Sequence, residues 1–453
     1  MKFSKALRPS SLSTIAFVGA GGKSTALFQL ARELPPPIIL SATTHLGLWQ
    51  ISQADHHYVL QTKEEIQKIT TSGVILVTGR IEGDRTKGLR EDAIYWLREY
   101  CKSSSIPLLI EADGSRQKPL KAPDEHEPPI PQFVEQVVQV AGLSGLGKPL
   151  AEEFVHRPEI FARLSGLQLG ENITPAALIH ILTHPEGGLK NIPKDAYRVA
   201  LLNQADTPEL QAQADSIAKA LLPTYHSVLI ASLQEETIHA VREPIAGIIL
   251  AAGKAQRYGQ PKQLLDWRGE PFIRSVAKTA LAAGLAPVIV VTGAYADQVE
   301  AALKDLPVQI AHNKAWQSGQ ASSIRAGLGP HPPPRGTLPK NQGLWGRAGE
   351  AAGGAIFLLA DQPQVTVNIL HALMEEHAAT LAPIIAPMVI DQRANPVLFD
   401  RVAFPDLMKL EGDVGGRAIF SKYHVTYLPW HDDVLLLDVD TPDHYQRLKD
   451  LLE

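Results

Sequence analysis

The stretch "IILAAGKAQRYGQPKQLL" (residues 248–265) decides how the second half of the chain folds. Its apolar start predicts a buried strand, and the small residues that follow it would let a nucleotide lie directly against the backbone. Arg257 and Lys262 come next and can reach the triphosphate. Catalysis of displacement at an α-phosphate depends mainly on positioning and electrostatics, so these two cations are candidate catalytic residues. A glycine-rich turn followed by surface basic residues is the structural alternative.

Strand and helix patterns alternate through the rest of this half. Apolar runs at 286–293, 306–313, 353–363 and 433–442 predict further strands. Such alternation favours an α/β fold with a mostly parallel sheet and helices on both faces, as in Rossmann-like domains. A Gly- and Pro-rich stretch at 329–354 predicts a surface excursion.

Three aspartates end the predicted strands of this half. Asp361 follows one apolar run, and Asp438 and Asp440 follow another. Strand ends of one sheet can converge, and carboxylate oxygens suit Mg²⁺ when phosphate and water complete its coordination. We therefore predict Asp361 and Asp440 as Mg²⁺ ligands, with Asp438 as a further ligand or a close neighbour. A strand-end turn is the alternative.

The first half begins with a second nucleotide pattern, "TIAFVGAGGKST" (residues 14–25). A predicted strand leads into a glycine-rich loop that opens a helix, which would present backbone N–H groups to phosphate. A full P-loop needs glycine where Phe17 stands, so the loop is P-loop-like and shortened. A glycine turn before a structural helix is the alternative. The predicted nucleotide-binding residues are Gly19, Gly21, Gly22, Lys23, Ser24 and Thr25.

Polar residues also end the neighbouring strands predicted for this half, which is expected to be a parallel α/β sheet. Glu111 and Asp113 stand where a carboxylate orders Mg²⁺ in nucleotide-binding sheets. Thr44 and His45 follow another strand, where ligands bind in open sheets. We expect His45 to contact phosphate or substrate, with a local hydrogen-bonding role as the alternative.

A weaker base-reading pattern occurs in "LLNQAD" (residues 201–206). Asn203 and Asp206 have the spacing of the Asn-Lys-x-Asp sequence of guanine-nucleotide binders, but Gln204 replaces the lysine. A base-reading role and a plain strand-end turn fit these residues equally well.

Composition bounds the remaining possibilities. The chain has 453 residues and a net charge of −5, which gives no reason to expect nucleic acid or an anionic membrane as partner. Its one cysteine, Cys101, excludes an internal disulfide and cysteine-based metal clusters, and fits the reducing cytoplasm. No apolar run is long enough to span a membrane, and the one near the N-terminus does not fit a signal peptide. The pattern restarts near residue 240 without repeated motifs, which predicts two fused domains, 1–240 and 241–453.

The first domain resembles the YqeC-type family over residues 10–235. The motifs "GAGGKST", "ATTH", "EADGSRQKPLKAPDEHEPPIP", "AGLSGLGKPL" and "LLNQAD" carry this resemblance. It implies an accessory role for selenium-dependent molybdenum hydroxylases, with ATP or GTP at the glycine loop and a hydroxylase as client. Arg116, Lys118 and Lys121 beside the acidic pair suit an anionic ligand next to a metal, or are a solvated loop.

The second domain resembles the MobA-like nucleotidyltransferases, and most closely their molybdenum cofactor cytidylyltransferase (MocA-type) branch. Residues 245–450 carry "LAAGKAQRYGQPK", "VVTGAYAD", "HNKAWQSGQASSIRAGL", "LADQP", "NPVLF", "GDVGGR" and "LDVDTPDHY" in the family's order. The resemblance implies transfer of CMP from CTP to the phosphate of the molybdenum cofactor, with release of pyrophosphate.

The same resemblance implies roles for particular residues. A turn bearing glycine is expected before "NPVLF", but Asp391 to Ala394 stand there, which alters a loop near the acceptor. Trp316 is interpreted as a packing residue. The nucleotide side comprises Leu250, Ala251, Ala252, Gly253, Arg257, Lys262, Thr292, Gly293 and Ser323, and the acceptor side comprises Asn313, Gly319, Asn395 and Pro396.

The leading interpretation is a bifunctional cytoplasmic protein, a cytidylyltransferase fused to a nucleotide-binding maturation module. A sugar- or polyol-phosphate nucleotidyltransferase is the enzymatic alternative, because it shares the glycine loop and the metal carboxylates. A cofactor carrier that releases no pyrophosphate is the non-enzymatic alternative.

Overall fold

The computed structural model describes residues 1–9, 13–254, 261–329 and 352–450. The chain forms two compact units, Met1–Arg242 and Glu243–Glu453, called unit 1 and unit 2 below. Arg257 and most of the stretch 329–354 lie outside the described residues, so what the sequence predicts for them stays a prediction. Among the described helices, none has the length and apolar character needed to cross a membrane.

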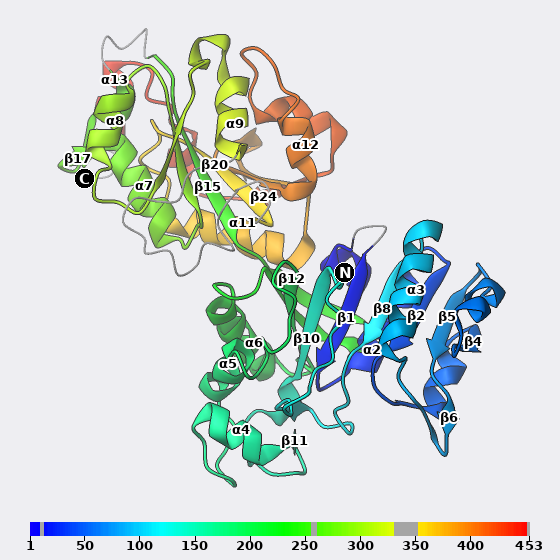
Figure 1. Ribbon diagram of the computed structural model, residues 1–453. Coiled ribbons are helices and arrows are strands. Elements are labelled where there is room, and N and C mark those ends of the chain that lie inside the picture. Colours follow the sequence, from blue (N-terminus) through cyan, green and yellow to red (C-terminus); the bar gives the residue numbers. More distant parts are fainter. Residues whose placement is uncertain (10–12, 255–260, 330–351, 451–453) are drawn as a thin grey trace. The chain divides into compact units, whose positions relative to one another are not determined.

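Unit 1 is built on a nine-stranded sheet in which only the edge strand β14 runs antiparallel to its neighbour. This confirms the α/β class with a mainly parallel sheet. Figure 1 labels the sheet from β12 to β4. The order across the sheet is β14 (Thr237–Arg242), β13 (Ser227–Ser232), β12 (Tyr197–Asn203), β10 (Gln136–Gly142), β1 (Thr14–Gly19), β8 (Leu108–Glu111), β2 (Ile38–Ala42), β5 (Val74–Thr78) and β4 (His56–Val59).

The centre of this sheet is β1, which is buried along its whole length between β10 and β8. Apolar residues on both of its faces explain this, since a central parallel strand is covered on both sides. The chain turns from β1 toward β2 on one side and later adds β10, β12 and β13 on the other. Ligand crevices form beyond the strand ends at such a divergence.

Helices and small sheets complete unit 1. Helix α3 packs on one core of the large sheet, and α4, α5 and α6 pack on another. The helices are α1 (Phe3–Leu7), α2 (Lys23–Glu33), α3 (Glu91–Ser104), α4 (Pro158–Ser165), α5 (Pro175–Thr183) and α6 (Pro208–Leu221), and the small sheets are β3 (Leu46–Gly47) with β7 (Arg85–Thr86) and β6 (Ile81–Glu82), and β11 (Val155–His156) with β9 (Leu120–Lys121).

Unit 2 is built on an eight-stranded mixed sheet whose parallel part is centred on β15. The antiparallel part begins where β23 pairs with β20. The order is β19 (Gln309–His312), β18 (Val288–Thr292), β15 (Ile245–Ala251), β20 (Gly354–Leu359), β23 (Val397–Asp400), β21 (Ile384–Val389) and β22 (Gln392–Arg393), with β24 (Val425–Pro429) also on β21.

Alternate residues of β15 point into two cores. Ile249 packs with α7 and α11 on one face, and Ile248 packs with α9 and α12 on the other. The second face brings the start of α9 beside the end of β15. The helices are α7 (Phe272–Ala282), α8 (Ala296–Ala302), α9 (Gln320–Leu328), α11 (Val367–Thr380), α12 (Phe404–Leu407) and α13 (Pro442–Asp450), and a short hairpin joins β16 (Asp266–Trp267) to β17 (Glu270–Pro271).

One predicted strand is wrong. Residues 433–442 contain the 3-10 helix η10 (Asp433–Leu436) followed by irregular chain, not a strand. The Asp432 side chain accepts a hydrogen bond from Val434 N at 3.1 Å, which starts the helical turn. The apolar run is nevertheless buried at Leu435, which explains why its sequence pattern resembles that of a buried strand although the segment forms a turn.

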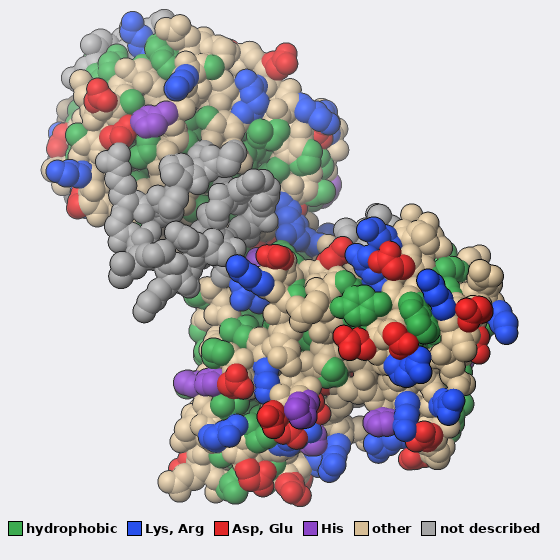
Figure 2. All heavy atoms as spheres, in the orientation of Figure 1, with side chains coloured by type: hydrophobic (Ala, Val, Ile, Leu, Met, Phe, Trp, Pro, Cys, Tyr) green, Lys and Arg blue, Asp and Glu red, His purple; other side chains and the backbone are tan. Residues whose placement is uncertain are grey.

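On the surface visible in Figure 2, acidic and basic side chains are intermixed, in line with the small net charge.

Candidate functional site

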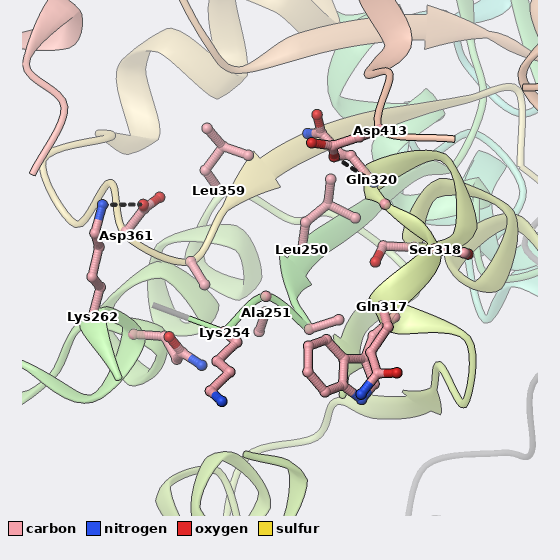
Figure 3. Close-up of a pocket in the computed structure, with 17 residues that line it drawn as sticks. Leu250, Ala251, Lys254, Lys262, Gln317, Ser318, Gln320, Leu359, Asp361 and Asp413 are labelled. Atoms are coloured by element: carbon pink, nitrogen blue, oxygen red, sulfur yellow. Dashed lines mark hydrogen bonds and ion pairs between the residues drawn. The ribbon is translucent and has the colours of Figure 1, made fainter. Parts of the chain in front are cut away.

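In unit 2, a cavity of about 620 Å³ lies at the carboxyl end of β15 (Figure 3). Its walls come from the ends of β15 and β20 and from the segment around the start of α9. Of the predicted residues, the structure brings together Leu250, Ala251, Ala252, Gly253, Lys262, Gly319, Ser323 and Asp361. Sequence reasoning missed, or gave another role to, Lys254, Gln263, Trp316, Gln317, Ser318, Gln320, Leu359, Ala360 and Asp413.

Lys262 and Asp361 form the charged end of this cavity, and Asp440, which does not line it, pairs with Lys262. Lys262 Nζ lies 2.5 Å from Asp440 Oδ1 and 4.0 Å from Asp361 Oδ2 (Figure 3 shows the latter pair). Partial burial raises the pKa of Asp361; the nearby carboxylates Asp438 and Asp440 add to this, while Lys262 opposes it. The structure therefore places three predicted residues within reach of one another, although they come from distant parts of the chain.

Asp438 is hydrogen-bonded to a glutamine. Gln362 Nε2 donates a hydrogen bond to Asp438 Oδ1 at 2.8 Å. Among the described residues, no three side chains of the types His, Cys, Asp and Glu are grouped closely enough to hold a metal ion. A cation at this end would therefore take Asp361 and Asp440 from the protein and further oxygens from its substrate and water.

The opposite end of the cavity is shaped by a close backbone contact. Gly319 has φ +104°, and a Cβ there would lie 2.5 Å from Gly412 O and from the Asp413 backbone. Asp413 Oδ1 accepts a hydrogen bond from Gln320 N at 3.1 Å, which fixes the contact (Figure 3). The motif "GDVGGR" was the sequence signal for Asp413, but nothing local to it revealed its partner.

Asn313 supports the cavity from behind. Its Nδ2 donates to Ser322 Oγ at 2.8 Å and to Ser323 Oγ at 3.0 Å, and its Oδ1 accepts from Ala315 N at 2.9 Å. The buried amide thus holds the start of α9, and Ser323 carries the contact into the cavity.

Several predictions for unit 2 differ from this lining. Asp438, Asp440 and Asn313 do not line the cavity, although Asp440 pairs with Lys262 and Asn313 bonds to Ser323, which both line it. Trp316, interpreted as packing, lines the cavity. The cavity-lining residues do not include Thr292, Gly293, Asn395 and Pro396. Thr292 is fully buried with its hydroxyl 3.1 Å from His312 Nδ1, so it supports the sheet behind the site.

In unit 1, a cavity of about 1070 Å³ lies beyond the carboxyl end of β1. The structure brings together in its walls the predicted residues Gly21, Gly22, Lys23, Ser24, Thr25, Thr44, His45, Glu111, Arg116 and Lys118. Those that sequence reasoning did not place there include Trp49, Gln50, Arg85, Glu127, His156, Arg157 and Gln234.

The glycine loop of unit 1, residues 19–25, is held by buried contacts. Gly22, at the start of α2, has φ +122°, which favours glycine. Lys23 Nζ donates to Gly19 O at 2.7 Å and lies 3.2 Å from Asp113 Oδ1, with both side chains about 2% exposed. Asp113 Oδ2 also accepts from Gly19 N at 3.0 Å. Asp113 thus holds the loop and its lysine instead of lining the cavity.

Ser24 connects the loop to Glu111. Ser24 Oγ donates to Glu111 Oε2 at 2.8 Å and accepts from Gln50 Nε2 at 2.8 Å. Burial raises the pKa of Glu111, with Lys23 opposing. A serine hydroxyl at the head of the helix, backed by a carboxylate on the adjacent strand, is the arrangement that orders Mg²⁺ in P-loop sites.

Asn203 acts on this loop and does not face the cavity. Its Nδ2 donates to Gly21 O at 2.7 Å, and its Oδ1 accepts from Leu233 N at 3.0 Å. Asp206 is exposed and does not line the cavity. His45 Nδ1 lies 3.2 Å from Thr86 O, the local contact expected as the alternative, although the residue lines the cavity.

A charged network closes another wall. Lys121 Nζ lies 2.9 Å from both Asp113 Oδ2 and Glu127 Oε2, and Arg157 pairs with both oxygens of Glu127 at 2.6 and 2.9 Å. Burial opposes ionisation of Glu127, but the hydrogen bond from Arg157 and the charge of Lys121 lower its pKa to about 2. Burial and the neighbouring Arg157 and Lys121 lower the pKa of His156 to about 4, so the imidazole is neutral at pH 7.

These two units define a chain that joins an α/β domain with a glycine loop to a nucleotidyltransferase-type domain. The family model for the YqeC protein matches residues 15–159, and the model for the MobA-like NTP transferase domain matches residues 247–427. The chain belongs to both families, YqeC through unit 1 and MobA-like NTP transferase through unit 2.

Individual relatives support the same division. The chain is 31% identical to "Uncharacterized protein YqeC" of Escherichia coli (strain K12), covering 51% of this chain and 86% of that protein. It is 28% identical to "Nicotine blue oxidoreductase" of Paenarthrobacter nicotinovorans, covering 45% and 96%. It is also 31% identical to "Purine catabolism protein PucB" of Bacillus subtilis (strain 168), covering 46% and 98%.

Proposed function

We propose that unit 2 is a Mg²⁺-dependent cytidylyltransferase that transfers CMP from CTP to the terminal phosphate of the molybdenum cofactor and releases pyrophosphate. One observation carries the proposal: Lys262 lies between Asp361 and Asp440 beside the backbone cradle Ala251–Gly253. The choice of CTP and of this acceptor rests on the sequence motifs shared with the MocA-type branch.

The residues at the charged end fit a hard divalent cation. Asp361 and Asp440 offer carboxylate oxygens to a common point, which is the donor type that Mg²⁺ takes. Bound there, Mg²⁺ would neutralise charge on the phosphates as they rearrange. The ammonium of Lys262 occupies the space between these carboxylates in the structure, so it is placed to turn toward the triphosphate when a cation holds them.

The chemistry is a single displacement. An oxygen of the acceptor phosphate attacks the α-phosphorus of CTP and forms the new P–O bond. The bond from the α-phosphorus to the bridging oxygen breaks, and pyrophosphate leaves with the electron pair. Lys262 neutralises the charge on that leaving group, Ala251–Gly253 support the nucleotide, and the fixed Gly319–Asp413 contact orients the far side of the cavity.

Unit 1, in the same proposal, binds a nucleoside triphosphate, ATP or GTP, at the phosphate loop with Mg²⁺ at Ser24. The Ser24–Glu111 hydrogen bond and the buried Lys23 support this role. The fused module would prepare or deliver cofactor to a molybdenum hydroxylase client in the cytoplasm. Keeping both steps on one chain would limit the exposure of a labile cofactor to water.

Pyrophosphate release tests the unit 2 proposal. Full-length protein with Mg²⁺ and molybdenum cofactor is assayed with CTP, GTP and ATP, and with sugar phosphates as alternative acceptors. Release with CTP and the cofactor is expected, and Asp361→Ala should reduce it by about 10²–10³-fold, as typical for one electrostatic group. Asp297→Ala, on the exposed start of α8, is the matched control. Release only with sugar phosphates, or no release at all, would reject the proposal.

A further inference from the structure

One wall of the unit 1 cavity is joined to the glycine loop by a hydrogen bond between Gln50 and Ser24. It consists of residues from the 3-10 helix η1 (Leu48–Gln53), from β3 and from the start of β7. The cavity's volume of about 1070 Å³ is at the top of the ~300–1,000 Å³ typical of a single-ligand pocket. The space beside this wall is therefore available to something other than phosphate.

The position of Gln50 shows which end of a nucleotide this wall would face. Gln50 Nε2 donates to Ser24 Oγ at 2.8 Å, and its Oε1 accepts from Gly47 N at 2.8 Å. The hydroxyl at the position of Ser24 serves the terminal phosphates and their Mg²⁺. Gln204 and Gln234, which follow β12 and β13, line the cavity on the opposite side of β1, where the proposed function places the nucleoside.

An exposed indole stands on this wall. Trp49 lines the cavity with 57% of its surface exposed, and its Nε1 would lie 2.6 Å from a Cβ at Gly47. The ring is thus seated on the backbone of β3, with its remaining surface open. A large exposed aromatic surface in a cavity wall suits stacking of a planar ring.

Two arginines of the cavity wall are exposed and have no close ion pair with a described residue. Arg85 is 62% exposed, and its ion-pair partner Asp84 is 3.9 Å away. Arg116 is exposed and forms no ion pair with a described residue. Arg157, in contrast, is committed to Glu127. Arginine side chains that keep their hydrogen-bond donors suit a phosphate group.

We propose that Trp49, Arg85 and Arg116 bind a second ligand, a planar heteroaromatic ring that carries a phosphate, at the terminal-phosphate end of the nucleotide. The inference rests on the proposed function, because it takes the phosphate loop as the nucleotide's site. Unit 1 then holds two ligands at once, a nucleoside triphosphate on the loop and a ring phosphate on the wall.

Calorimetric titration of the full chain with a pterin monophosphate tests this. Binding is expected in the presence of saturating Mg²⁺ and a non-hydrolysable ATP or GTP analogue. Trp49→Ala should weaken it by about 5- to 150-fold, the range of one lost stacking contact, and Trp49→Phe should restore most of it. Arg116→Ala should weaken the pterin monophosphate but not the unphosphorylated pterin. Leu169→Ala, a residue 56% exposed that does not line the cavity, is the control.

Three outcomes would overturn the proposal. Competitive displacement of the probe by the nucleotide analogue would assign Trp49 to the nucleotide's own base. Equal affinity of Trp49→Ala and wild type, or no binding of the probe to wild type, would remove the stacking site. If the nucleotide analogue does not bind, the proposed nucleotide site fails, and titration of the probe without nucleotide still tests the wall separately.

Discussion

Replacing Asn203 by alanine tests whether this residue holds the glycine loop or reads a base. Its amide bridges Gly21 O and Leu233 N, and both hydrogen bonds are buried. Asn203→Ala leaves a carbonyl and an N–H without partners, at ~1–3 kcal/mol each. The two unpaired groups together cost about 2–6 kcal/mol. The cost should fall in the lower part of this range, because water from the adjacent cavity can hydrogen-bond to the exposed groups. We expect a loss of about 2–4 kcal/mol in the stability of unit 1.

The single cysteine provides an assay for unit 1 within the full chain. Cys101 lies in α3, is 3% exposed, and burial raises the pKa of its thiol to about 12. A thiol reagent therefore reaches it only when this part of unit 1 opens. When opening and closing are fast, a loss of 2–4 kcal/mol raises the labelling rate by about 30- to 700-fold.

The exposed Asp206 supplies the matched control. If Asn203 and Asp206 form a base-reading pair, both alanine variants should change nucleotide preference and leave labelling nearly unchanged. If Asn203 is a clamp, only Asn203→Ala should accelerate labelling, and Asp206→Ala should stay within about 0.5 kcal/mol of wild type. Equal labelling rates for the two variants would refute the clamp.

Three further predictions concern both units. Gly319→Ala should destabilise unit 2 in thermal unfolding by ~1–3 kcal/mol and lower pyrophosphate release, because the alanine would have a left-handed φ and its Cβ would clash with backbone. Gly284→Ala is the control, since Gly284 has φ +77° but open space around it, and an equal effect of the two substitutions would exclude the clash. The pKa of Glu127 is about 2 in the folded protein against an ordinary 4.5, so its ionised form stabilises unit 1 above pH 4.5, and this contribution is lost as pH falls from 4.5 toward 2. In Glu127→Gln, the free energy of unfolding measured with urea should therefore depend less on pH across that window. An unchanged pH dependence would contradict the assignment. Lys262→Met should reduce pyrophosphate release by about 10²–10³-fold while Lys262→Arg retains part of it, and wild-type rates in the methionine variant would remove Lys262 from the leaving-group role.

The parts of this fold that could be predicted from sequence are those that a short run of consecutive residues determines. The strand before Gly19, the helix opened by Lys23 and the aspartate after β20 each follow from a short run of residues, and the structure has all three. Parallel strands place their carboxyl ends at one edge, so residues at those ends gather without further information. This explains why Lys23, Ser24 and Glu111 were found together.

The remaining features depend on contacts between distant loops. Nothing near Gly319 indicates that Gly412 packs against it, and nothing near Asn203 indicates its bond to Gly21, 182 residues earlier. The run at 433–442 fits a strand and a buried turn equally well by periodicity, and a side-chain cap at Asp432 decides for the turn. No sequence motif marked Trp49 as a candidate site residue, and only its exposure in the structure distinguishes it from a core residue.

The central position of β1 has a consequence for synthesis. Its two neighbours, β8 and β10, and the amide of Asn203 all come from chain made later than the loop they support. At ~5–20 residues per second, the ribosome needs roughly 9–36 s to add the 182 residues between Gly21 and Asn203. The nascent glycine loop therefore acquires the carboxylate contact of Asp113 first and the amide contact of Asn203 last. The proposed nucleotide affinity of unit 1 should therefore arise only after Asn203 has been made.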